Sequence, residues 1–113
     1  MCFALPSRTL AAVRASERFA VNVLRFEDAE LARVFASKRV AREKFESVTH
    51  VTAHGVPVLD RALAWIACSL LELLPGGDHA IGIGEVIGMG TGEEADPLVF
   101  YRGRYTTIAD PPD

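Results

Sequence analysis

The spacing of apolar residues predicts two helices in the first half of the chain. One covers Arg8–Ala15, where Leu10 and Val13 stand three residues apart on one helical face. The second and clearer helix covers Glu27–Ser37, where an apolar stripe follows acidic residues that favour the positive end of a helix dipole. The strongly charged segment Lys38–Glu46 is either a helical turn or a mobile loop.

Most of the remaining chain is predicted to form short strands separated by glycine and proline residues. The predicted strands are Phe19–Leu24, Val48–Ala53, Leu63–Leu74, His79–Met89, Leu98–Tyr101 and Tyr105–Ile108. Turns are predicted at Gly55-Val56-Pro57 and at Pro75-Gly76-Gly77-Asp78. Because Leu63–Leu74 is largely apolar on both sides, we expect it to be buried between two layers. Residues 110–113 form a tail that cannot continue a sheet. Together these elements predict a mainly β, antiparallel barrel with two short helices.

The beginning of the chain has an unusual pattern. Met1–Leu5 resembles the last half of a buried strand and leads directly into Pro6 and a helix start. Six short strands barely close a small barrel. We therefore expect that the N-terminal strands of the barrel are absent from this sequence.

Composition narrows the classes of protein that fit. The 113 residues suit one domain. Half of the residues are hydrophobic and 24% are charged, and this composition excludes a disordered polymer. A net charge of -3 without clustered Lys and Arg predicts no nucleic-acid partner. The apolar run Ala62–Leu71 has ten residues, against about 20 for a membrane span, so no membrane insertion is expected. Cys2 and Cys68 form no ligand pattern or secreted framework, which predicts a cytoplasmic protein.

The start of the first helix is the best candidate for ligand chemistry. Ser7-Arg8-Thr9 brings two hydroxyls, a guanidinium group and the N–H groups of a first helical turn together, which is the chemistry that holds a phosphate. The alternative is an ordinary serine cap beside a solvated arginine. Both interpretations stay open at this point.

Other candidates are weaker. A glycine series runs through Gly82, Gly84, Gly88, Gly90 and Gly92. A dinucleotide fingerprint needs a helix after such glycines, and residues 91–97 are acidic and contain a proline. We expect instead a glycine face that another backbone or a flat ligand approaches closely.

The histidines give no catalytic pattern. His50 and His54 lack further ligands with suitable geometry, so no metal site is expected. His79, at the head of a strand, is expected to be a partly buried histidine bonded to a backbone carbonyl. No serine or cysteine stands in the context of a nucleophile.

A set of short stretches carries a resemblance to a known family. The stretches are Pro6-Ser7-Arg8-Thr9, Leu10–Val13, Arg18–Leu24, Leu31–Ser37, Lys44-Phe45, Gly55–Leu59, Gly77-Asp78-His79 and Pro97–Tyr105. In this order and spacing, the sequence resembles the flavin reductase domain, the small reductase component that feeds reduced flavin to two-component monooxygenases. The resemblance extends over nearly the whole chain from Pro6 to Ile108.

The resemblance implies a fold and an activity. The fold is a mainly β, antiparallel Greek-key split β-barrel with two short helices, of which residues 1–113 are the C-terminal two-thirds. The activity is transfer of a hydride from NADH or NADPH to FMN or FAD, for use by a partner flavin-dependent monooxygenase. Family members are usually homodimers with flavin near the subunit interface. The alternatives are a non-catalytic flavin-binding or dimerisation module, and an inactive fragment without the N-terminal flavin-cradling strands.

The resemblance also implies site residues. Those expected to contact FMN are Pro6, Ser7, Arg8, Ala12, Val13, Ser37 and Lys38. Those expected to receive the nicotinamide cofactor are His79, Phe100, Tyr101, Arg102 and Gly103. In this interpretation His79 orients the nicotinamide or its phosphates and Arg102 pairs with a phosphate. No acid or base is required because both cofactors carry their own redox chemistry.

Overall fold

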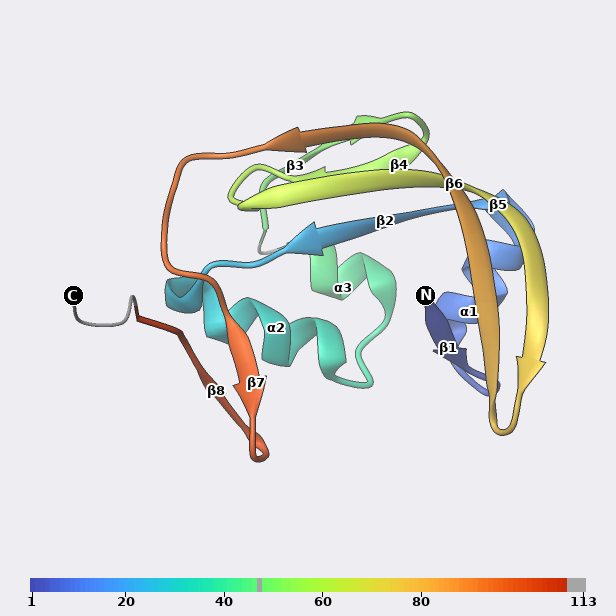
Figure 1. Cartoon of the computed structure of the whole chain (residues 1–113), viewed down its shortest axis with the longest axis horizontal. Coiled ribbons are helices and arrows are strands. Elements are labelled where there is room, and N and C mark those ends of the chain that lie inside the picture. Colours follow the sequence, from blue (N-terminus) through green and yellow to red (C-terminus); the bar gives the residue numbers. More distant parts are fainter. Residues whose placement is uncertain (47, 110–113) are drawn as a thin grey trace.

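The computed structural model of the chain describes residues 1–46 and 48–109 and contains a curved four-stranded antiparallel sheet (Figure 1). The order of its strands is β1 (Cys2–Ala4), β6 (His79–Thr91), β5 (Ala64–Gly76) and β2 (Arg18–Val23). Two further hairpins are β3 (His50–Ala53) with β4 (Val56–Leu59), and β7 (Val99–Tyr101) with β8 (Arg104–Thr106). The helical elements are α1 (Arg8–Ser16), the 3-10 turn η1 (Phe26–Asp28), α2 (Ala29–Ala36) and α3 (Ala41–Glu46). Among the described residues, no helix is long and apolar enough to cross a membrane.

The β5–β6 hairpin dominates the sheet and gives it its curvature. Its two 13-residue strands meet at Gly77 and Asp78, and Gly77 has φ +66, which favours glycine. The pairing register shifts twice, so that Ile87 is an extra residue on β6 and Leu71 an extra residue on β5. Bulges of this kind bend and twist a strand pair. In Figure 1 the hairpin crosses the upper part of the molecule and then bends sharply toward the turn.

The core lies where α1 covers one end of this sheet. Leu10 is fully buried and Val13 nearly so, which confirms the helical face expected from their spacing. They pack with Phe3 of β1, Phe19 of β2 and Cys68 of β5. The rings of Phe3 and Phe19 meet edge to face with centroids 5.8 Å apart, a favourable geometry for aromatic pairs.

The glycine face of β6 accommodates aromatic side chains. A Cβ atom added at Gly82 would lie 2.9 Å from the Phe3 ring, and one added at Gly84 would lie 2.7 Å from Phe19. Farther along β6, Gly90 lies under the Trp65 ring. The expectation of a close approach is confirmed: its partners are aromatic side chains at these three positions, and at Gly92 the partner is a backbone group, the carbonyl of Ala62.

The β3–β4 hairpin is attached to the sheet through side chains. The Asn22 amide donates to the carbonyl of Pro57 at 3.2 Å, and its oxygen accepts from the N–H of Leu59 at 3.0 Å. Arg18 donates to the carbonyl of His54 at 2.7 Å. These bonds fix the hairpin beside β2 without a continuous strand ladder between them.

Several predicted elements have different bounds. The turn expected at Gly55-Val56-Pro57 is wrong, since the positive φ angles fall at His54 and Gly55 and β4 begins at Val56. Pro57 is tolerated because β4 belongs to a hairpin of only two strands, so its missing N–H interrupts no wider sheet.

The helical region also differs from its prediction. The helix expected from Glu27 begins at Ala29, because the preceding residues form the 3-10 turn η1. Of the two alternatives for Lys38–Glu46, the helical turn is confirmed over α3.

The strand expected between two layers is only half buried. Ala67 and Cys68 are buried, whereas Leu71 is 63% exposed. Leu71 is exposed because it is the bulged residue, and Leu74 is exposed because the end of the hairpin extends past the core. The expected tail at 110–113 lies outside the described residues.

Candidate functional site

The N-terminus of α1 has the properties of an anion site. Ser7 is the N-cap, and its hydroxyl accepts the backbone N–H of Leu10 at 3.1 Å. The first turn contains no acidic residue, and Arg8 and Thr9 are exposed there. The first N–H groups of a helix have no acceptor within the helix and carry the positive end of its dipole, so they attract a negatively charged group.

Arg8 links this helix start to the segment after α2. Its guanidinium donates to the backbone carbonyl of Lys38 at 3.4 Å, thirty residues away in sequence. Ser37, next to it, donates its hydroxyl to the carbonyl of Val34, and accepts the N–H of Arg39 at 3.4 Å. The structure therefore brings together residues from both segments that were predicted to contact flavin.

Of the remaining three predicted flavin contacts, Pro6 is exposed directly before the N-cap, and Ala12 and Val13 lie on α1 itself. Ala12 is exposed one helical turn after Arg8, on the same side of the helix. Val13 faces the other way and is buried with Leu10 in the core. Its side chain therefore supports the helix.

His79 lies close to the start of α1. It pairs with Ala4 across the β1–β6 ladder, and the carbonyl of Asp78 accepts the N–H of Leu5 at 3.0 Å. Its Nδ1 lies 2.8 Å from Oδ1 of Asp78, and this hydrogen bond, followed by the charge of His79, lowers the pKa of the Asp78 carboxyl. The expected bond to a backbone carbonyl is thus replaced by a bond to a neighbouring carboxylate.

The other predicted nicotinamide residues occupy the β7–β8 hairpin. Arg102 and Gly103 form its two-residue turn with φ angles of +51 and +79. Phe100 and Tyr101 are 67% and 57% exposed, and the Arg102 guanidinium lies 5.4 Å from the centre of the Tyr101 ring. In Figure 1 this hairpin lies at the lower left of the view and the β5–β6 turn at the lower right. Within one chain, the structure does not bring His79 beside this hairpin.

Three features near these segments escaped the sequence patterns. The ammonium group of Lys44 in α3 donates to the carbonyl of Phe35 in α2 at 2.8 Å. A hollow of about 710 Å³ follows Lys38 and is lined by Arg39, Val40, Arg42, Glu43 and Glu46.

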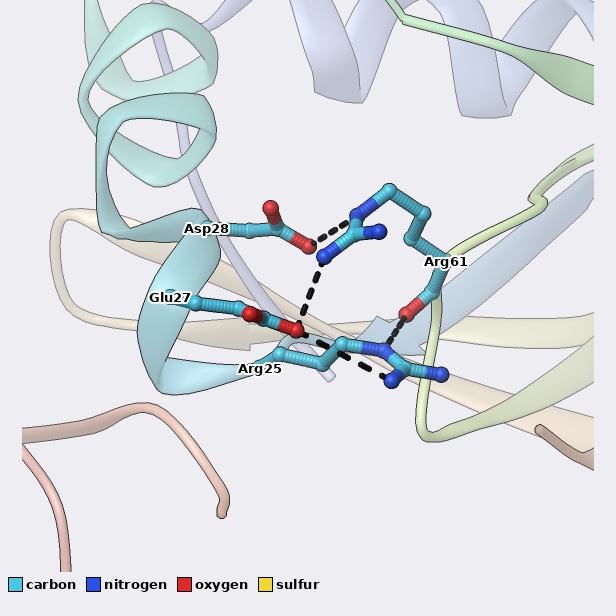
Figure 2. Close-up of polar contacts among 4 residues, drawn as sticks. All are labelled: Arg25, Glu27, Asp28 and Arg61. Atoms are coloured by element: carbon cyan, nitrogen blue, oxygen red, sulfur yellow. Dashed lines mark hydrogen bonds and ion pairs between the residues drawn. The ribbon is translucent and has the colours of Figure 1, made fainter. Parts of the chain in front are cut away.

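The third feature is a charged cluster, in which Glu27 contacts both Arg25 and Arg61, and Asp28 contacts Arg61 (Figure 2). Arg61 pairs with Asp28 at 2.9 Å and with Glu27 at 2.8 Å, and the Asp28 carboxylate above all raises the pKa of the Arg61 guanidinium. Arg25 is 9% exposed and donates to the Arg61 carbonyl. No local sequence pattern predicts these contacts, because the two arginines are 36 residues apart in the sequence.

Comparison with known proteins identifies the family. Residues 1–109 match the model of the flavin reductase like domain. The chain belongs to this family. It is 38% identical over 108 residues to the reductase subunit of a flavin-dependent monooxygenase from Rhodococcus jostii, covering 95% of this chain and 54% of that protein. It is 37% identical over 110 residues to an NADH-dependent FMN reductase from Streptomyces nodosus, covering 92% of this chain and 58% of that protein. The chain spans about half the length of the curated relatives that it matches.

Solved structures of this flavin reductase family have the same fold. The NADH:FAD oxidoreductase SgcE6 of Streptomyces globisporus superposes with a TM-score of 0.89 at 29% identity, covering 97% of this chain and 68% of that one. Nitrilotriacetate monooxygenase component B from Mycobacterium thermoresistibile superposes with a TM-score of 0.90 at 32% identity, covering 100% of this chain and 65% of that one. The expected mainly β split-barrel fold class is confirmed by these likenesses.

Proposed function

We propose that this chain is a NAD(P)H-dependent flavin reductase, which transfers a hydride from NADH or NADPH to FMN or FAD. The observation that carries the proposal is the bond from Arg8 to the Lys38 carbonyl, because it joins the two segments expected to hold flavin. Relatives that are named flavin reductases and reductase subunits support the same activity.

The groups present fit the phosphate of a flavin. The guanidinium of Arg8, the hydroxyl of Thr9 and the first N–H groups of α1 are all donors, and no carboxylate stands in that turn. Donors of this kind form charge-assisted hydrogen bonds to phosphate oxygens. A bound flavin supplies the hydride acceptor, and the task of these residues is to hold it in one orientation.

The nicotinamide residues support a homodimer as part of the proposal. The start of β6, where His79 stands, and the β7–β8 hairpin lie apart in one chain (Figure 1), so a second copy is needed to bring such groups to one site. The hairpin exposes Phe100 and Tyr101, and exposed aromatic residues are frequent anchors of protein interfaces. We include a flavin-dependent monooxygenase as recipient of the reduced flavin, in line with the names of the relatives. The free thiols of Cys2 and Cys68 suit a cytoplasmic place of action.

A second candidate function is a flavin-binding or dimerisation module without turnover. It is favoured by the same separation of His79 from the β7–β8 hairpin, which leaves the nicotinamide residues divided in one chain. In this case flavin binds at the α1 start, but NADH is not oxidised.

One set of measurements distinguishes these functions. The purified chain is titrated with FMN and FAD while flavin fluorescence is followed, and NADH and NADPH oxidation is then recorded at 340 nm with and without added flavin. Flavin binding with flavin-stimulated oxidation supports the reductase, and binding without oxidation supports the module. Absence of flavin binding rejects both. Sedimentation velocity measures whether the chain is a dimer.

A further inference from the structure

We propose that α3 acts as a clamp on the flavin-contacting segment Ser37–Lys38, and that Lys44 is the positioning residue of this clamp. This inference rests on the proposed flavin site for its functional consequence. Its structural basis is independent of any ligand, because it concerns contacts between α2, α3 and the segment that joins them.

The helices on either side of this segment have little packing of their own. Among the described residues of α2 and α3, none is buried. Few buried apolar contacts mean that a segment opens at low free-energy cost. The position of Ser37 and Lys38 must therefore depend on a small number of specific contacts.

Lys44 provides the most direct of these contacts. Its partly buried ammonium group donates at 2.8 Å to the carbonyl of Phe35, one of the last carbonyls of α2, which lack N–H donors within the helix. A cation at this end also complements the helix dipole. Because Lys44 follows Phe35 by nine residues, this bond closes the chain around Ser37 and Lys38 into a compact loop.

An aromatic contact strengthens the same closure. The ring of Phe45 meets that of Phe35 edge to face, with centroids 5.0 Å apart and an interplanar angle of 88°. The loop is also contacted by Arg8, which reaches the Lys38 carbonyl from α1. The loop is thus held by contacts from two helices, α3 and α1, and Lys44 acts on flavin only through the loop.

The first test measures the loop without ligand. Trypsin cleaves after Lys38 and Arg39, and mass spectrometry gives the rate at each bond. Lys44→Met removes the ammonium group, Lys44→Arg keeps a cationic donor, and Arg42→Met removes an equal charge from an α3 side chain that is 90% exposed. We expect about tenfold faster cleavage for Lys44→Met, from the loss of one charge-assisted hydrogen bond, and rates within about twofold of the parent for the other two. Equal rates for Lys44→Met and Arg42→Met overturn the clamp.

The second test connects the loop to flavin. For Lys44→Met we expect a rise of about fivefold to tenfold in the FMN Kd, with an unchanged kcat at saturating FMN, and recovery in Lys44→Arg. A lowered kcat with an unchanged Kd overturns the positioning role. If the parent chain binds no FMN, the proposed function fails, while the cleavage rates still decide on the clamp. Far-UV circular dichroism checks that each variant is folded. If Lys44→Met does not fold, both measurements are repeated on Phe45→Leu, which weakens the contact between the Phe45 and Phe35 rings.

Discussion

Arg25 donates a 2.6 Å hydrogen bond from Nε to the backbone carbonyl of Arg61, so two residues of like charge are joined across 36 positions of sequence. The proximity of the two positive side chains is tolerated because the carboxylate of Glu27 lies close to both, 3.9 Å from the Arg25 guanidinium and 2.8 Å from that of Arg61. The bond connects the segment after β2 to the turn between β4 and β5. It also stands beside the Arg25–Pro97 bridge, which anchors the segment leading to the β7–β8 hairpin.

Replacing Arg25 by Met should destabilise the chain by about 2 kcal/mol, since a charge-assisted bond in a nearly buried setting is lost. Urea unfolding followed by circular dichroism measures the change. Arg42→Met is the control, because its exposed pair with Glu46 at 3.8 Å contributes about 0.5 kcal/mol or less. Equal effects of the two substitutions would show that Arg25 has no special structural role.

Replacing Gly84 by Ala should destabilise the fold by about 1–3 kcal/mol, because the new methyl group collides with Phe19 and Cys68 in the core. Phe19→Leu makes room at the same place. The double variant Gly84→Ala/Phe19→Leu should therefore lose less stability than the sum of its single variants. Strict additivity in thermal or urea unfolding contradicts this account of the glycine face.

Replacing Arg8 by Gln should raise the FMN Kd about tenfold, because the guanidinium is the phosphate donor of the proposed site and also forms the link to Lys38. Arg14→Gln is the matched control, since it removes the same charge from the last turn of the same helix. Fluorescence titration measures both variants. A Kd that rises equally in both variants indicates a general effect of charge and rejects the assigned contact.

The Asp78 carboxyl should titrate below its ordinary pKa, and His79→Ala should raise this pKa toward the ordinary value. A carboxyl whose pKa is depressed by folding contributes stability above its unfolded pKa, and this contribution is lost as the pH falls through the folded pKa. The effect on stability is small because both side chains are exposed to solvent. Carbon-13 NMR of the aspartate carboxyls during acid titration measures the shift, and an unchanged Asp78 pKa in His79→Ala contradicts the pairing.

Local patterns predicted the elements whose structure depends on near neighbours. Ser7 caps α1 as expected, because the cap bond spans only three residues. The turn at Gly77 and Asp78 was predictable because glycine adopts the positive φ that it requires. The same reasoning failed at Val56 and Pro57, where proline suggested a turn but the two-stranded hairpin permits a strand.

The candidate site was predictable in part. The phosphate chemistry of Ser7-Arg8-Thr9 follows from residue types at a helix start. Lys44 could not be recognised as a partner of Phe35, since its bond forms only after α3 folds back on α2. The separation of the start of β6 from the β7–β8 hairpin also follows from the path of the chain, and neither local segment indicates it.

The amino-acid sequence alone determined the antiparallel β character, the capped first helix and the long glycine-turned hairpin, because propensity, periodicity and turn chemistry act over a few residues. The tertiary structure alone decided that Arg8 meets Lys38, that aromatic rings fill the glycine face of β6, and that Arg25 is buried against the carbonyl of Arg61. The physical reason is that these contacts join residues far apart in the chain. Their geometry is set by the bend of the sheet and the packing of α1 against it.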